Sequence, residues 1–77
     1  MKKLLEYLVT SIVEHPEAVV VEESEEEGQI NLNFQVHPDD VKIVIGKLGQ
    51  TIKALRELVK IKAIKERKKV NVNLLNQ

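Results

Sequence analysis

A pair of glycines three residues apart is the part of this 77-residue sequence that most needs a chemical explanation. Gly46 and Gly49 enclose Lys47 and Leu48, and residues with helical periodicity lie on both sides of them. A glycine inside a helix costs about 1 kcal/mol relative to alanine, so two of them predict a sharp turn or a close backbone approach. The amides of Lys47, Leu48 and Gly49, at the start of the next helix, would point donors at an anion such as phosphate. Lys47 adds a positive charge to this turn.

Two better-known phosphate-binding loops do not fit these glycines. A Walker loop needs a glycine five positions before Gly46 and Ser or Thr after Lys47, where this sequence has Val41 and Leu48. A dinucleotide-binding loop needs a glycine two positions before Gly46, where this sequence has Val44. The turn therefore matches neither of these two phosphate-binding patterns, and a different loop family has to be considered.

Catalysis and metal binding have little support in the sequence. It contains no cysteine, which excludes disulfides, thiolate metal sites and cysteine nucleophiles. His15 and His37 each precede a proline at the end of an element, the sequence suggests no Ser or Cys partner for either, and helix capping accounts for Asp39 and Asp40. We therefore predict no catalytic residues, no metal site, no cofactor and no enzyme activity.

The charges are balanced overall but separated along the chain. Twelve basic and twelve acidic residues give a net charge of zero. Residues 1–40 hold two lysines and ten acidic residues, whereas residues 41–77 hold ten basic and two acidic residues. Such asymmetry indicates that the basic half contacts a nucleic acid or another acidic surface.

The glycine turn must be positioned by elements that the hydrophobic periodicity predicts. A first helix, with Leu4, Leu5, Leu8, Val9 and Ile12 on one face, is ended by Pro16. Strands are predicted at residues 18–23, 29–36 and 70–74, and helices at residues 41–45 and from Thr51 to about Arg67. The acidic turn Ser24–Gly28 would join the first two strands as an antiparallel hairpin, with a positive φ at Gly28.

The order α-β-β-α-α-β predicts an α+β fold. The helical crossover makes the second and third strands parallel, which gives a three-stranded mixed sheet with helices on one face. Alternation predicts that Ile30, Leu32, Phe34 and Val36 point inward. The other face would carry a row of neutral amides, namely Asn31, Asn33, Gln35, Asn71 and Asn73.

The segment Val44-Ile45-Gly46-Lys47-Leu48-Gly49-Gln50-Thr51-Ile52-Lys53-Ala54-Leu55 resembles the signature of K-homology (KH) RNA-binding domains. The element order resembles the type II form, over residues 1–77 as one domain. The opening Lys-Lys-Leu-Leu-Glu-Tyr-Leu helix and the Phe34–Asp40 segment are similar to the small bacterial stand-alone KH proteins of the KhpA/YlqC family. Members usually carry a polar or acidic residue where Leu48 stands, and Arg where Gln50 stands.

The resemblance implies an RNA site. In KH domains the G-x-x-G loop clamps the backbone of about four nucleotides, here with Gly46, Lys47, Leu48, Gly49 and Gln50. An apolar groove beside the loop would hold the bases, with Val44, Ile45, Ile52, Leu55 and Val72 as candidates. The alternative is that these five side chains are core residues, which we favour for Leu55 and Val72.

A basic stripe extends the predicted RNA site along the long helix. Lys53, Arg56, Lys60 and Arg67 stand at spacings of three, four and seven, which places them on one side of a helix. Glu57 is the one acid in the first fourteen residues of that helix, too few for extensive salt-bridge pairing. The stripe either steers phosphates or is an ordinary solvated face.

A second apolar stripe on the same helix predicts self-association. Ile52, Leu55, Val59 and Ala63 already supply a core-facing stripe, yet Ala54, Leu58 and Ile61 repeat on a neighbouring face. Exposed apolar surface usually marks an interface, so these three residues predict a homodimer, or a heterodimer with a related KH protein. The alternative is a wide core face.

Two functions are consistent with these residues. The first is a single-stranded RNA-binding protein of weak sequence preference, which acts as an RNA chaperone or post-transcriptional regulator. The second is a protein-interaction module that joins a larger KH-containing RNA-binding partner. The resemblance implies a link to cell shape and cell wall biogenesis.

With no signal peptide and no apolar run of membrane-spanning length, we expect a cytoplasmic protein without membrane insertion.

Overall fold

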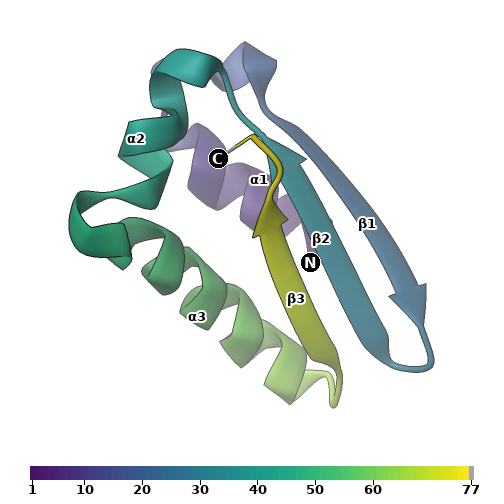
Figure 1. Ribbon diagram of the computed structural model, residues 1–77. Coiled ribbons are helices and arrows are strands. Elements are labelled where there is room, and N and C mark those ends of the chain that lie inside the picture. Colours follow the sequence, from purple (N-terminus) through teal and green to yellow (C-terminus); the bar gives the residue numbers. More distant parts are fainter. Residues whose placement is uncertain (77) are drawn as a thin grey trace.

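Strand β2 (Gln29–Gln35) is the centre of a three-stranded sheet in the computed structural model, which describes residues 1–76 (Figure 1). It pairs antiparallel with β1 (Val20–Glu26) and parallel with β3 (Lys69–Leu74). The helices are α1 (Lys2–Thr10), α2 (Val41–Ile45) and α3 (Gln50–Lys65). Short 3-10 turns lie at Pro16–Ala18, Pro38–Asp40 and Lys47–Gly49. The predicted element order and the mixed sheet are confirmed.

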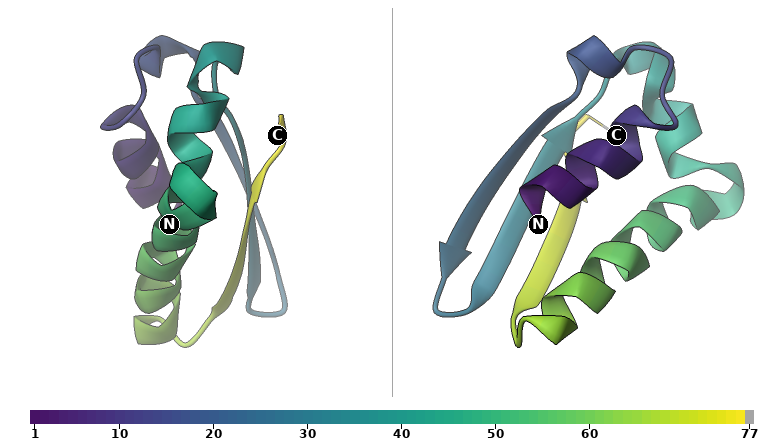
Figure 2. Two further views of the ribbon diagram at one scale, coloured as in Figure 1. Left: turned by 60° about the vertical axis from the view of Figure 1, so that its left-hand side comes forward. Right: turned by 180° about the vertical axis from the view of Figure 1, so that it is seen from behind.

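All three helices cover one face of the sheet (Figure 2). The core between the two layers contains the four predicted inward residues of β2 and the segment after it, Ile30, Leu32, Phe34 and Val36. Leu5 and Val9 of α1, and Ile52, Leu55 and Val59 of α3, pack against them. The open face carries the predicted amides, two pairs of which bond across the parallel strands: Asn71 donates to Asn31, and Asn73 donates to Asn33.

The hairpin turn is shorter than predicted. The strands pair as far as Glu26 opposite Gln29, so Glu27 and Gly28 alone form the turn instead of Ser24–Gly28. Both turn residues have a positive φ, 51° and 80°, which is the combination found in type I′ hairpins. The acidic run therefore lies mostly on an edge strand, where charge discourages pairing with other chains.

The first helix ends earlier than Pro16. Helix α1 stops at Thr10, and the hydroxyls of Thr10 and Ser11 donate to the carbonyls of Glu6 and Tyr7. Such side-chain bonds to the backbone favour helix ends over helix continuation. Ile12 consequently leaves the predicted apolar face and is partly exposed.

Helix α3 ends two residues before the predicted position. Arg67 adopts a left-handed φ of 58°, its N–H donates to Ile64 O, and the Lys68 N–H donates to Ala63 O. These two bonds form a Schellman motif, which closes the helix and turns the chain directly into β3. Within residues 1–76, no helix is both long enough and apolar enough to cross a membrane.

Candidate nucleic-acid interface

The first glycine of the predicted loop is required by packing. Gly46 follows α2 with a φ of 76°, a region that glycine adopts without strain. A Cβ atom at this position would overlap the side chain of Thr51 and lie 2.8 Å from its backbone nitrogen. Gly46 therefore allows the first turn of α3 to lie against the end of α2.

The second half of the loop is open to solvent. Leu48 and Gly49 both have a positive φ, 57° and 73°, and the Leu48 side chain is 88% exposed. A Cβ atom on Gly49 would meet nothing within 4 Å. The Gly49 N–H, predicted to face phosphate, instead donates to Gly46 O at 3.1 Å and closes the loop. The predicted set of phosphate-facing amides is thereby reduced to those of Lys47 and Leu48.

Helix α3, which starts directly after the loop, lies next to the edge strand β3 (Figure 1), and a groove lies between the two elements. Its hollow measures about 290 Å³ and is lined by Arg56, Glu57, Lys60, Val70, Asn71, Val72 and Asn73. Arg56 is held in place because its Nε donates to Val72 O at 3.1 Å. Three polar residues of this groove, Asn71, Asn73 and Glu57, are not among the RNA-binding residues that the sequence predicts. The alternation of β3 predicts that both asparagines lie on the face opposite its buried residues. It does not predict that they also lie beside α3.

The basic stripe is present with three of its four predicted members. Lys53, Arg56 and Lys60 are all exposed on α3, and Arg56 and Lys60 line the groove. The inclusion of Arg67 in the stripe is wrong, because α3 ends at Lys65 and the left-handed turn carries Arg67 out of the helical register. Gln50, the first residue of α3, is exposed next to the loop.

The five apolar residues predicted to line the base-binding groove differ in how deeply they are buried. Val44 is fully buried, so its assignment to a base-binding surface is wrong: its side chain packs within the core. Leu55 and Val72 are buried, in agreement with the core role favoured for them, and Ile52 is buried as well. Ile45 is only partly buried and packs against the edge of the core, so it keeps accessible surface close to the loop.

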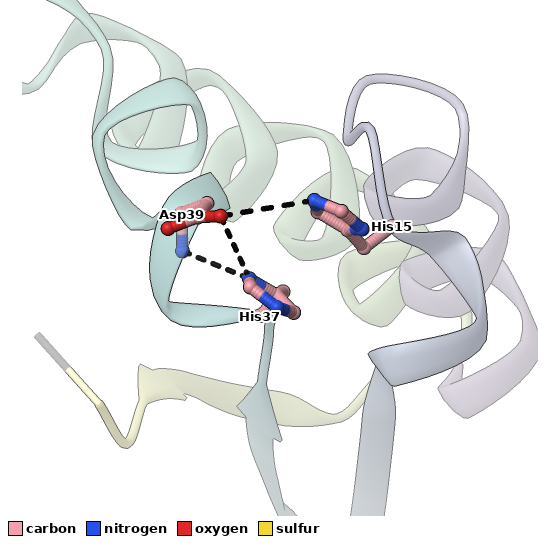
Figure 3. A group of neighbouring side chains, drawn as sticks. All are labelled: His15, His37 and Asp39. Atoms are coloured by element: carbon pink, nitrogen blue, oxygen red, sulfur yellow. Dashed lines mark hydrogen bonds and ion pairs between the residues drawn. The ribbon is translucent and has the colours of Figure 1, made fainter.

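A histidine pair lies at the N-terminal end of α2 (Figure 3). The rings of His15 and His37 stack with centroids 4.0 Å apart, and one carboxylate oxygen of Asp39 lies 4.0 and 3.6 Å from their nitrogens. His37 Nδ1 accepts a hydrogen bond from the Asp39 N–H and so caps the following turn. A metal ion bonds imidazole nitrogens in the ring plane, whereas these rings lie face to face, so the arrangement favours packing over metal binding.

The role predicted for Asp40 is wrong. Its side chain makes no capping hydrogen bond to the helix that it precedes. Instead its buried carboxylate accepts the N–H groups of Glu14 and His15, at 3.1 and 2.9 Å. Asp40 is thus a structural link between the α1–β1 connection and the start of α2.

The second apolar stripe of α3 is exposed. Leu58 and Ile61 are 48% and 54% accessible, and Ala54 lies in line with them on the same face. The alternative of a wide core face is therefore wrong for these three residues.

Comparison with known proteins places these features in a family. The sequence profile described as "KhpA/KhpB, KH domain" matches residues 2–74. The chain is 38% identical over 76 residues to the RNA-binding protein KhpA of Halalkalibacterium halodurans, covering 99% of this chain and 100% of that protein. It is 47% identical over 75 residues to RNA-binding protein KhpA of Clostridium perfringens, covering 97% and 100%. It is 51% identical over 59 residues to that of Thermotoga maritima, covering 77% and 79%.

Solved structures share the fold at lower sequence identity. Era of Aquifex aeolicus bound to GDP and aluminium fluoride superposes with a TM-score of 0.68 at 18% identity, over 95% of this chain and 28% of that chain. Era in complex with MgGDPNP and nucleotides 1506–1542 of 16S ribosomal RNA gives a TM-score of 0.57 at 16% identity, with the same coverage of both chains. The family match agrees with the prediction of a non-enzymatic protein. From its glycine loop, its fold and these relatives, the chain belongs to the KhpA/KhpB family of KH-domain proteins.

Proposed function

We propose that this protein binds single-stranded RNA in the cytoplasm, as a chaperone or post-transcriptional regulator of weak sequence preference. The observation that carries the proposal is the Gly46–Gly49 loop, which exposes Lys47 and Leu48 at the start of the helix that lines the α3–β3 groove. Its relatives are named RNA-binding proteins, which supports the same function for this chain.

The loop would hold the RNA backbone and the groove would hold the bases. Lys47 is exposed and supplies a positive charge, while the amides of Lys47 and Leu48 supply donors. Lys53, Arg56 and Lys60 continue the positive charge along α3. Ile45 and the exposed edge of β3 supply apolar surface and backbone polar groups for the bases.

A loop variant with a charge-matched control tests this proposal. Replacing Lys47 and Leu48 by Asp places two negative charges where phosphate would lie, so we expect single-stranded RNA to bind at least tenfold more weakly. The pair Lys3→Asp and Tyr7→Asp, on exposed positions of α1, makes the same change in net charge away from the groove. This control should bind as the parent does, with circular dichroism reporting the fold of both. Equal binding by the folded loop variant would remove the loop from the RNA site.

The salt dependence measures how many phosphates are held. Two to four contacts, at about −0.7 each, predict a log-log slope of about −1.4 to −2.8 for single strands. Duplex RNA should bind more weakly, because the groove needs unpaired bases. A much steeper slope, or a preference for duplex, would show that the basic stripe binds RNA without the groove.

We also infer a dimer through Ala54, Leu58 and Ile61, either with a second copy or with a larger KH-domain protein. The exposure of Leu58 and Ile61 favours this second function, because exposed apolar side chains on one helix face form interfaces. The family name, which joins KhpA and KhpB, is consistent with a related partner.

Analytical ultracentrifugation tests the dimer. Ile61→Lys should yield a folded monomer, because the added charge would be buried in the interface without a partner. Lys65→Glu, one turn further along α3, changes charge without removing apolar surface and serves as the control. A parent protein that sediments as a monomer at high micromolar concentration, alone and with a KH-domain partner, would contradict the proposal.

A further inference from the structure

The α3–β3 groove continues into a second hollow, on the side away from the glycine loop. This hollow measures about 370 Å³ and is lined by Gln29, Lys60, Ala63, Ile64, Lys68, Lys69, Val70 and Asn71. It shares Lys60, Val70 and Asn71 with the first hollow, so the two are neighbouring parts of one groove.

The side chains of the second hollow have the chemistry of a nucleotide site. Lys60, Lys68 and Lys69 bring three positive charges that suit phosphates. Ala63, Ile64 and Val70 provide an apolar surface on which a base or ribose can lie, and the side chains of Gln29 and Asn71 offer amide donors and acceptors. The first hollow has a basic rim with less apolar lining, so the second is the better place for a base.

The turn after α3 fixes the two added lysines. The Schellman motif at Arg67 directs Lys68 and Lys69 back beside the helix, and the Lys69 N–H donates to Gly28 O at 3.0 Å. Lys60 is eleven residues beyond Gly49, which is about 16 Å along the helix axis at 1.5 Å per residue. A strand of four nucleotides held at the loop would therefore end close to the second hollow, since stacked nucleotides advance about 3.4 Å each.

We propose that the second hollow binds the nucleotides that continue the loop-bound segment of the same RNA strand, giving a site of about six to eight nucleotides. This inference rests on the proposed RNA binding. It adds Lys68, Lys69 and Ile64 to the RNA-contacting residues, none of which belongs to the glycine loop or to the basic stripe.

One of these lysines, Lys68, already forms an ion pair with a carboxylate of the protein. Lys68 Nζ lies 3.0 Å from an oxygen of Glu25, on β1. The hydrogen bond and the charge of Glu25 raise the pKa of Lys68 above its ordinary value, as expected for an amine paired with a carboxylate. An RNA phosphate would take the place of this carboxylate. Removing the Glu25 charge should therefore strengthen binding of the longer strand.

The test compares oligonucleotides of four and eight nucleotides with the full chain, by fluorescence anisotropy. An eight-nucleotide strand offers about five positions for a four-nucleotide site, so register alone gives up to about a fivefold gain. We expect the parent to prefer the longer strand by about twentyfold or more. Lys68→Gln with Lys69→Gln should lower that preference to about fivefold while binding the four-nucleotide strand as the parent does.

Two further variants make the result specific. Lys62→Gln removes a positive charge from the same helix, about 200° around it from Lys60, and should leave the preference unchanged. Glu25→Gln should raise affinity for the eight-nucleotide strand about two- to threefold and leave the shorter strand unaffected. If the double lysine variant is poorly folded by circular dichroism, Lys69→Gln alone should still reduce the preference.

The outcomes separate this inference from the proposed function. If the parent binds both strands within about fivefold of each other, and neither the lysine variants nor Glu25→Gln changes that ratio, the second hollow is not part of the RNA site. RNA binding at the loop would then stand. If neither strand binds the folded parent at all, the proposed function itself is wrong.

Discussion

The His15 N–H donates to Asp40 Oδ2 at 2.9 Å, and so joins two segments that are 25 residues apart in the sequence. The other carboxylate oxygen accepts the Glu14 N–H at 3.1 Å. Asp40 directly precedes α2, the helix that leads into the glycine loop. This fully buried carboxylate thus ties the α1–β1 connection to the start of α2.

Removing the Asp40 carboxylate should destabilise the fold. Asp40→Ala leaves two partly buried N–H groups without their acceptor, at about 1–3 kcal/mol each, so we expect a loss of about 2–6 kcal/mol in the free energy of unfolding. Asp40→Asn keeps one acceptor oxygen and should lose less. Asp39→Ala is the control, because Asp39 is exposed and its ion pairs contribute little. Urea unfolding measures all three, and equal losses for Asp39→Ala and Asp40→Ala would contradict the structural role of Asp40.

The two loop glycines should respond differently to alanine. Gly46→Ala brings a Cβ atom into Thr51, so α2 and α3 must move apart. Gly49→Ala has open space around it and costs only the left-handed backbone strain, about 1–2 kcal/mol. Thermal unfolding should therefore show a clearly larger loss for Gly46→Ala. The reverse order would mean that the Gly46–Thr51 approach is not required.

A stabilising substitution is expected at the end of α3. Arg67→Gly removes the strain of a left-handed non-glycine residue, partly offset by the entropy of glycine, and should raise stability by about 0.5–1 kcal/mol. That corresponds to a rise in Tm of about 2–8 °C for a chain of this size. Arg67→Ala removes the same charge but keeps the Cβ atom, so it should give no such rise. A matching rise in both variants would assign the effect to charge instead of backbone strain.

Adding a positive charge next to the loop should strengthen RNA binding. Gln50→Arg places a guanidinium at the first residue of α3, and one added phosphate contact should steepen the log-log salt slope by about 0.7. Gln35→Arg makes the same substitution on the open face of the sheet, away from the loop and from the groove. Binding at several salt concentrations distinguishes the two, and identical slopes would show that position 50 does not contact the RNA.

Local sequence patterns determined the elements of this protein. The strict alternation from Gln29 to Val36 identified both the buried and the exposed face of β2, because successive side chains of a strand point to opposite sides. The glycines at 46 and 49 located the loop, because both positions require a positive φ. The exposed stripe of Ala54, Leu58 and Ile61 was also visible, since helical spacing places these residues away from the core face.

Only the tertiary structure decided which neighbours these residues meet. Asp40 has the local appearance of a helix cap, yet its acceptors are used by N–H groups more than twenty residues away. Val44 next to the loop is drawn into the core, whereas Ile45 remains at its edge. The hollow around Lys60, Lys68 and Lys69 arises from the packing of α3 against an edge strand and from the turn at Arg67. Periodicity describes one element at a time, and a groove between two elements exists only once they are packed together.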